Sequence, residues 1–154
     1  MGWTTLASDT ARFYLAAAYD SSANLTYAID GNNGGATSTV TGYSHGSNAW
    51  TTLASDSAGA RYYLAAAYDS NANLTYAIDG NNGSAAISTV TGYSHGSNAW
   101  TALASDTARY GLAAAYDSNA NLTYAIDGYN GSTTIPTVTG YSTPPPLSGF
   151  LAFM

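Results

Sequence analysis

The feature that most constrains this chain is a threefold internal repeat with a period of about 48 residues. The pair Asp30-Gly31 returns as Asp79-Gly80 and as Asp127-Gly128, at spacings of 49 and 48 residues. The repeats differ in length beside Ala58-Gly59 and in the glycine-rich segment after each Asp-Gly pair. Length changes confined to such stretches are typical of loops between fixed elements, so each repeat predicts one small structural unit.

Three further sets of residues keep the same phase. They are Arg12, Arg61 and Arg109; Trp3, Trp50 and Trp100; and Tyr43, Tyr93 and Tyr141. Counted from tryptophan to tryptophan, the repeats span about 3–49, 50–99 and 100–142, so residues 1–142 hold three repeats. A proline-rich and apolar tail follows at 143–154, which we expect to be a short unordered end.

Each repeat has the pattern of β-strands separated by tight turns. In the second repeat the expected strands are 64–68, 74–78, 89–93 and 100–103. Short runs that contain β-branched and aromatic residues and end at Asp, Asn, Gly or Ser are strand and turn signals. The sequence therefore predicts an all-β fold with four short antiparallel strands per repeat.

The residues of each repeat resemble the kelch repeat of β-propeller proteins. The resemblance lies in the runs R-x-x-L-A-A-A-Y, Y-A-I-D-G, T-V-T-G-Y and N-A-W-T-x-L, and it covers roughly residues 3–141. It implies three four-stranded propeller blades, with the spaced tyrosine and tryptophan packed between blades. Asp-Gly stands in all three repeats where the kelch family has a double glycine.

The number of strands does not close a ring within one chain. Residues 3–6 read as a fourth strand with no repeat before it, and the third repeat reaches Pro144 before its own fourth strand. Propellers typically have about four to eight blades, so three are too few. We expect two chains to form a six-bladed homodimer, in which the Trp3 strand of each completes the third blade of the other. A longer array or a higher multiple of three blades is the alternative.

The composition excludes several classes of partner. The chain has nine Asp, three Arg and neither Lys nor Glu, for a net charge of −6, which argues against binding to nucleic acids or to anionic membranes. It has no cysteine, and its first residues lack the basic and apolar regions of a signal peptide. A lysine-free chain rich in Asn, Ser, Thr and Tyr favours a cell-surface or secreted origin.

The residues after the second strand of each repeat are the candidate binding positions. They are Asp30, Asn32, Asp79, Asn81, Asp127 and Tyr129. On the rim of a propeller these side chains would be positioned to bind a cation, a sugar or a basic peptide. The alternative is that each Asp pairs with an arginine of a repeat or caps backbone N–H groups.

Other candidate sites have a simpler interpretation. The patterns beginning at Asp69 and Asp117 resemble the start of a calcium loop, but they lack its glycine at the sixth position and its glutamate at the twelfth. We therefore read them as hairpin turns. His45 and His95 have no carboxylate or second histidine nearby in sequence, so we expect them to be solvated turn residues. Because nothing in the sequence assembles a nucleophile, a base and an orienting group, we also expect no enzyme activity and no cofactor.

The sequence thus predicts a non-catalytic binding or scaffold module that recognises a protein through rim loops. A lectin-like carbohydrate-binding propeller is the first alternative, because Tyr, Asn and Asp are abundant and charges are few. An enzyme that uses a ring of rim Asp residues is another alternative. A structural or engineered fragment with no ligand is the last.

Overall fold

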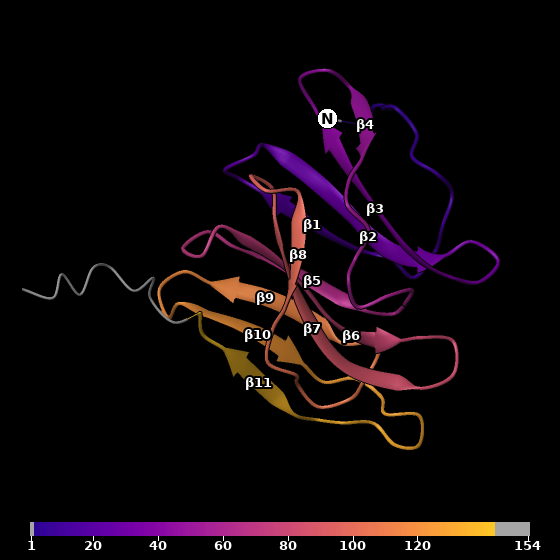
Figure 1. Cartoon of the computed structure of the whole chain (residues 1–154), viewed down its shortest axis with the longest axis vertical. Coiled ribbons are helices and arrows are strands. Elements are labelled where there is room, and N and C mark those ends of the chain that lie inside the picture. The colour runs from indigo at the N-terminus through magenta and orange to yellow at the C-terminus, as the bar shows by residue number, and fades with distance from the viewer. Residues whose placement is uncertain (1, 144–154) are drawn as a thin grey trace, which may run out of the picture.

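The computed structural model describes residues 2–143 and contains three antiparallel β-sheets, one from each repeat (Figure 1). The first sheet contains β1 (Ala16–Asp20), β2 (Leu25–Asn32), β3 (Ala36–Ser44) and β4 (Ala49–Thr52). The second contains β5 (Ala65–Asp69), β6 (Leu74–Asn81), β7 (Ala86–Ser94) and β8 (Ala99–Ala102). The third contains β9 (Ala113–Asp117), β10 (Leu122–Ile126) and β11 (Val138–Tyr141). The all-β prediction is confirmed, and no helix in the described residues is long and apolar enough to cross a membrane.

The hairpins between the first and second strands of each sheet are held by an aspartate. One carboxylate oxygen of Asp69 accepts hydrogen bonds from the backbone N–H groups of Asn71 and Ala72, both at 2.9 Å. Its other oxygen accepts the Tyr76 hydroxyl at 3.0 Å. Asp20 and Asp117 bond their own turns in the same way. The hairpin interpretation of these residues is confirmed, because the aspartate satisfies turn N–H groups that have no strand partner.

The Asp-Gly pairs lie inside strands in two of the repeats, contrary to the expectation of a loop. In β6 the register to β7 shifts between Ile78 and Gly80, and Asp79 takes a φ of 55°. The same shift occurs in β2 at Asp30. A β-bulge adds one residue to a strand and redirects its side chain. Here it turns the aspartate inward, where both carboxylates are fully buried.

The three sheets meet along their first strands, because β1 lies beside β5 and β5 lies beside β9 (Figure 1). The backbone N–H of Tyr63 donates to the carbonyl of Tyr14 at 2.8 Å, and the N–H of Gly111 donates to the carbonyl of Tyr63 at the same distance. Small alanines such as Ala16 and Ala65 are buried on these strands, which lets the sheets approach closely.

The hydrophobic core is divided between the two interfaces of neighbouring sheets. In the first interface, Ile29 and Val40 of the first sheet pack with Leu64 and Tyr93 of the second. The second interface repeats this arrangement with Ile78, Val90, Leu112 and Ala125. Each sheet therefore buries its faces mainly against its neighbours, as expected for an array of repeats.

The segment before the first sheet differs from the sequence prediction. Residues 3–6 form no strand, and the Trp3 side chain is fully exposed. A strand needs a neighbour for its N–H and C=O groups, and the third sheet of the same chain does not supply one at this end. The predicted tail lies almost wholly outside the described residues.

Replacing Gly80 by alanine should lower stability, because this glycine lies where two segments approach closely. Its φ is 113°, and an added Cβ would lie 3.0 Å from the Tyr62 carbonyl oxygen and 3.1 Å from the Leu64 Cβ. We expect Gly80→Ala to lower the free energy of unfolding by about 2 kcal/mol or more in urea denaturation. Gly96→Ala is the matched control, because an added Cβ there meets nothing within 4 Å. Equal stability of the two variants would contradict the prediction.

Candidate functional site

The interface between the first and second sheets is built around Arg61, whose side chain is wholly buried. Its Nη1 donates to the carbonyls of Asp79 at 2.9 Å and Thr89 at 2.7 Å, which belong to its own sheet. Its Nε donates to the carboxylate of Asp30 in the first sheet at 3.2 Å and to that of Asp56 at 3.0 Å. One guanidinium thus joins two sheets and the linker that connects them.

Arg109 makes the same contacts between the second and third sheets. Its Nη1 donates to the carbonyls of Asp127 at 3.1 Å and Thr137 at 2.7 Å. Its Nε donates to the Asp79 carboxylate at 3.3 Å, and its Nη2 donates to Asp106. The planar guanidinium has five N–H donors in a fixed geometry, so it can bond several carbonyl and carboxylate oxygens at once.

Two carboxylates share each of these arginines, and this arrangement changes their protonation. Burial, together with the nearby charge of Asp56, raises the pKa of Asp30 to about 9 even though Arg61 opposes the shift. Burial and the charge of Asp106 raise the pKa of Asp79 to about 7. At neutral pH the carboxyl group of Asp30 is therefore protonated beside the Arg61 guanidinium.

This geometry corrects the predicted role of two binding candidates. Asp30 and Asp79 have no exposed surface, so neither carboxylate faces a ligand at the rim. The alternative offered by the sequence, pairing with an arginine, describes both of them. Asp127 has the same backbone conformation, with a φ of 57°, but its side chain is exposed.

Arg12 holds the equivalent place in the first sheet and has fewer partners. Its Nη2 donates to the Asp9 carboxylate at 2.8 Å and to the Ala28 carbonyl at 3.0 Å. Its Nη1 bonds the Thr39 carbonyl. The side chain is only 2% exposed, and its Nε is buried without a hydrogen-bond partner among residues 2–143.

The outer faces of the first and third sheets also expose apolar residues that are buried elsewhere. Leu15 is 36% exposed, whereas its equivalents Leu64 and Leu112 are 5% and 9% exposed. Val138 is 58% exposed, whereas Val90 is 5% exposed. The first sheet thus lacks a preceding sheet that would bury Leu15, and the third sheet lacks a following sheet that would bury Val138.

The tryptophans of the fourth strands join each sheet to the linker that precedes it. Trp50 Nε1 donates to the Ala7 carbonyl at 2.9 Å, and Trp100 Nε1 donates to the Ala54 carbonyl at 2.8 Å. Trp100 also lies beside Tyr93, its partner on the neighbouring strand, with ring centroids 5.1 Å apart. Of the two indoles, that of Trp100 packs against the core between the first and second sheets.

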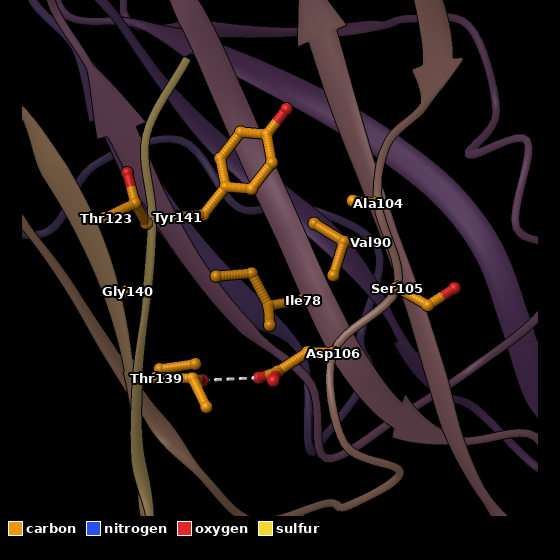
Figure 2. A pocket seen from close by; sticks show the side chains of 10 residues that line it. Ile78, Val90, Ala104, Ser105, Asp106, Thr123, Thr139, Gly140 and Tyr141 are labelled. Atoms are coloured by element: carbon orange, nitrogen blue, oxygen red, sulfur yellow. Dashed lines mark hydrogen bonds between the residues drawn. The ribbon is translucent and has the colours of Figure 1, made fainter. Parts of the chain in front are cut away.

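A cavity of about 110 Å³ lies between the second and third sheets (Figure 2). Ile78 and Val90 line one side, the linker residues Ala104 and Ser105 line another, and Tyr141 closes it. Figure 2 shows these side chains around the space, with the Thr139 hydroxyl bonded to Asp106 at 2.7 Å.

The equivalent place in the other interface is occupied by an indole. Trp100 packs against the core cluster that contains Ile29, Val40 and Tyr93, which correspond to Ile78, Val90 and Tyr141 of the cavity. Within the described residues, none of the three tryptophans lines this cavity. Trp100 packs against the other interface, Trp50 belongs to the first sheet, and Trp3 is exposed.

The remaining candidate residues gather with aromatic side chains at one end of the sheets. The bridged pairs are Asn32 with Phe13, Asn81 with Tyr62, and Tyr129 with Tyr110. The rings of Tyr14 and Tyr63 stack at a centroid distance of 3.7 Å. We call this end, with the loops β2–β3, β6–β7 and β10–β11, the loop end.

A groove of about 620 Å³ lies at the loop end between the second and third repeats. Its lining includes Asn81, Ser84, Tyr110, Asn130 and Ser132, and all of its lining residues are uncharged. Asn81 was among the residues predicted from the sequence, whereas Tyr110 and Asn130, which come from a different repeat, were not. The aromatic residues before each first strand were the available signal.

The comparisons with known proteins give no family assignment. No protein-family model matches the chain, and no curated protein matches it. The resemblance to kelch repeats therefore rests on the sequence runs given above.

The free energy of unfolding should fall as the pH rises from about 4 to about 9. Asp30 has a pKa of about 9 in the folded chain against 3.8 for a free side chain, so unfolding releases its proton throughout that window. Asp79 adds to the decrease up to about pH 7. Urea denaturation at pH 5, 7 and 9 measures the slope.

Asp30→Asn should flatten this dependence and be no less stable than the wild type at pH 9, because a neutral amide replaces a buried acid. Asp56→Asn is the matched comparison, since it removes a carboxylate that bonds Arg61 twice and also accepts the Thr91 hydroxyl at 2.9 Å. We expect that variant to lose stability at every pH. An unchanged slope in Asp30→Asn would refute the assignment.

Proposed function

We propose that this chain is half of a six-bladed, kelch-like propeller that assembles from two copies and acts as a non-catalytic binding scaffold. The three sheets are the blades of this proposal, with β1, β5 and β9 nearest the axis. The observation that carries it is the cavity beside Tyr141, which matches a place filled by an indole in the other interface.

The Trp3 segment has the sequence of the strand that the third sheet lacks. Trp100 pairs with Tyr93 in the second sheet, so by the same register Trp3 would pair with Tyr141 of a second copy. Its indole N–H would then reach the Ala104 carbonyl, as Trp100 reaches that of Ala54. Exchange of this strand supplies neighbours for two unpaired edges at once.

A leucine contact supports the same register. The Leu103 side chain lies over Gly92, where an added Cβ would be 3.1 Å from its Cδ1. Near Gly140, the equivalent glycine of the third sheet, Leu122 takes the place that Leu74 has near Gly92, but no counterpart of Leu103 is among the nearest atoms, and Leu6 is 47% exposed. Leu6 of a second copy fits this place, three residues after Trp3.

The scaffold role follows from what the assembled ring would display. All loop ends would lie on one face, so two copies would present six repeats of the same polar and aromatic surface. The buried arginine sites serve the interfaces: one oxygen of each of Asp30 and Asp79 is bonded to an arginine, and both side chains are buried away from solvent. A ring of this kind suits recognition of a protein partner through its loops, which is the function we propose first.

The mass of the wild-type chain in solution tests the assembly. Light scattering behind a sizing column, over a dilution series, should give a species at twice the 15.8 kDa chain mass. A folded monomer at all concentrations would overturn the proposal, and so would a stable species of three or more copies.

Trp3→Ala should weaken the dimer. Each of the two indoles would lose the roughly 2 kcal/mol that burial of a large apolar side chain contributes, so we expect Kd to rise at least about a hundredfold. His95→Ala is the control, because His95 is exposed in the equivalent turn of the second sheet and its ring stacks on Tyr27 of the same chain. Equal dissociation constants for the two variants would contradict strand exchange through Trp3.

A lectin-like function is the second candidate, and the groove at the loop end favours it. Hydroxyl and amide groups beside the Tyr110 ring suit a neutral sugar, whose C–H faces pack on aromatic rings while its hydroxyls form hydrogen bonds. The uncharged lining gives no comparable match to a basic peptide.

A glycan array followed by calorimetry separates these two functions. A lectin should bind a defined neutral glycan, and Tyr110→Ala should weaken that binding about tenfold or more through loss of the ring contact. Tyr19→Ala, at an exposed tyrosine outside the groove lining, is the control. An empty array together with capture of one protein in a pulldown would favour the protein scaffold.

A further inference from the structure

The contact between neighbouring sheets contains a polar set that recurs at both interfaces. The Nε of Arg61 donates to the Asp30 carboxylate, and the N–H of Gly31 donates to the Arg61 carbonyl at 2.9 Å. At the next interface, Arg109 makes the same two bonds with Asp79 and Gly80. Each sheet therefore offers an arginine to the sheet before it and an Asp-Gly pair to the sheet after it.

The first sheet carries an arginine that lacks its half of this set. The Arg12 guanidinium is already positioned by Asp9 and by backbone carbonyls, yet its Nε stays buried without a partner among residues 2–143. A buried donor on a charged group is costly to leave unbonded, because it has lost water and gained nothing in return.

The third sheet carries the complementary pair. Asp127 has a φ of 57°, equal to that of Asp30 and close to the 55° of Asp79, so its backbone already has the conformation found at the two completed contacts. It is exposed and follows the end of β10, whereas Asp30 and Asp79 are buried within strands, and Gly128 follows it as Gly31 and Gly80 follow the others.

We propose that Asp127 of a second copy accepts a hydrogen bond from the buried Nε of Arg12 and so completes the polar set of the first sheet. The Gly128 N–H of that copy donates to the Arg12 carbonyl in the same contact. A two-copy ring contains two such contacts, one at each junction. This inference rests on the proposed assembly and names a specific hydrogen bond between the two copies.

The chain is well suited to a direct test, because it contains only three arginines. Proton–nitrogen correlation spectra of the arginine Nε–Hε groups should show three signals, and Arg12→Lys identifies the signal of Arg12. In the wild-type dimer, all three Hε protons should exchange slowly with water. The signals of Arg61 and Arg109 are internal controls, since their Asp partners lie in the same chain.

Asp127→Ala should shift the Arg12 signal but not that of Arg61, speed the exchange of the Arg12 Hε, and raise the dimer Kd about thirtyfold or more. Asp117→Ala is the control for loss of one negative charge, and it should leave the Arg12 signal unchanged. Asp127→Asn keeps the backbone conformation and an acceptor oxygen, so it should restore part of the affinity.

The outcomes separate this inference from the proposed function. A wild-type chain that stays monomeric overturns both. A wild-type dimer that Trp3→Ala dissociates, but in which Asp127→Ala changes neither Kd nor the Arg12 signal, overturns the Asp127–Arg12 hydrogen bond and leaves the assembly intact. If Asp127→Ala fails to fold, the Asn variant carries the test, and an unaltered Arg12 signal in it overturns the hydrogen bond.

Discussion

The buried arginine between neighbouring sheets is the interaction on which the rest of this structure depends. Arg61 bonds two strands of its own sheet, the linker residue Asp56 and the previous sheet through Asp30. Lysine has one compact ammonium and could not reach these oxygens together. Because a buried charge is stable only when its donors are bonded, the site holds all of these segments in one arrangement.

This organisation makes the chain an open array. Each sheet needs one neighbour to accept its arginine and another to cover its Asp-Gly pair, and only the middle sheet has both within the chain. At both ends of the array, the free face exposes an apolar residue whose equivalents are buried between sheets: Leu15 in the first sheet and Val138 in the third. In the proposed dimer, stability and assembly would be linked, because the positions that join neighbouring sheets within the chain are those that lack a neighbour at its ends.

The elements that depend on local sequence were predictable, and the site was predictable only in part. The turn at Asp69 is set by bonds within a few residues, so its sequence indicated it. The bulge at Asp79 was not foreseen, because it places the carboxylate against an arginine 30 residues away. The groove residues Tyr110 and Asn130 were missed for the same reason, since two repeats must pack before the groove exists.

By itself the sequence determined the all-β class, the threefold repeat and the positions of most strands, because alternating patterns and turn residues act over short distances. It also raised arginine pairing as one of two roles for the repeated aspartates. Only the tertiary structure decided between them, by burying Asp30 and Asp79 and leaving Asp127 exposed. The physical reason is that burial depends on a neighbouring sheet, and residues that are equivalent in sequence differ in whether the chain provides one.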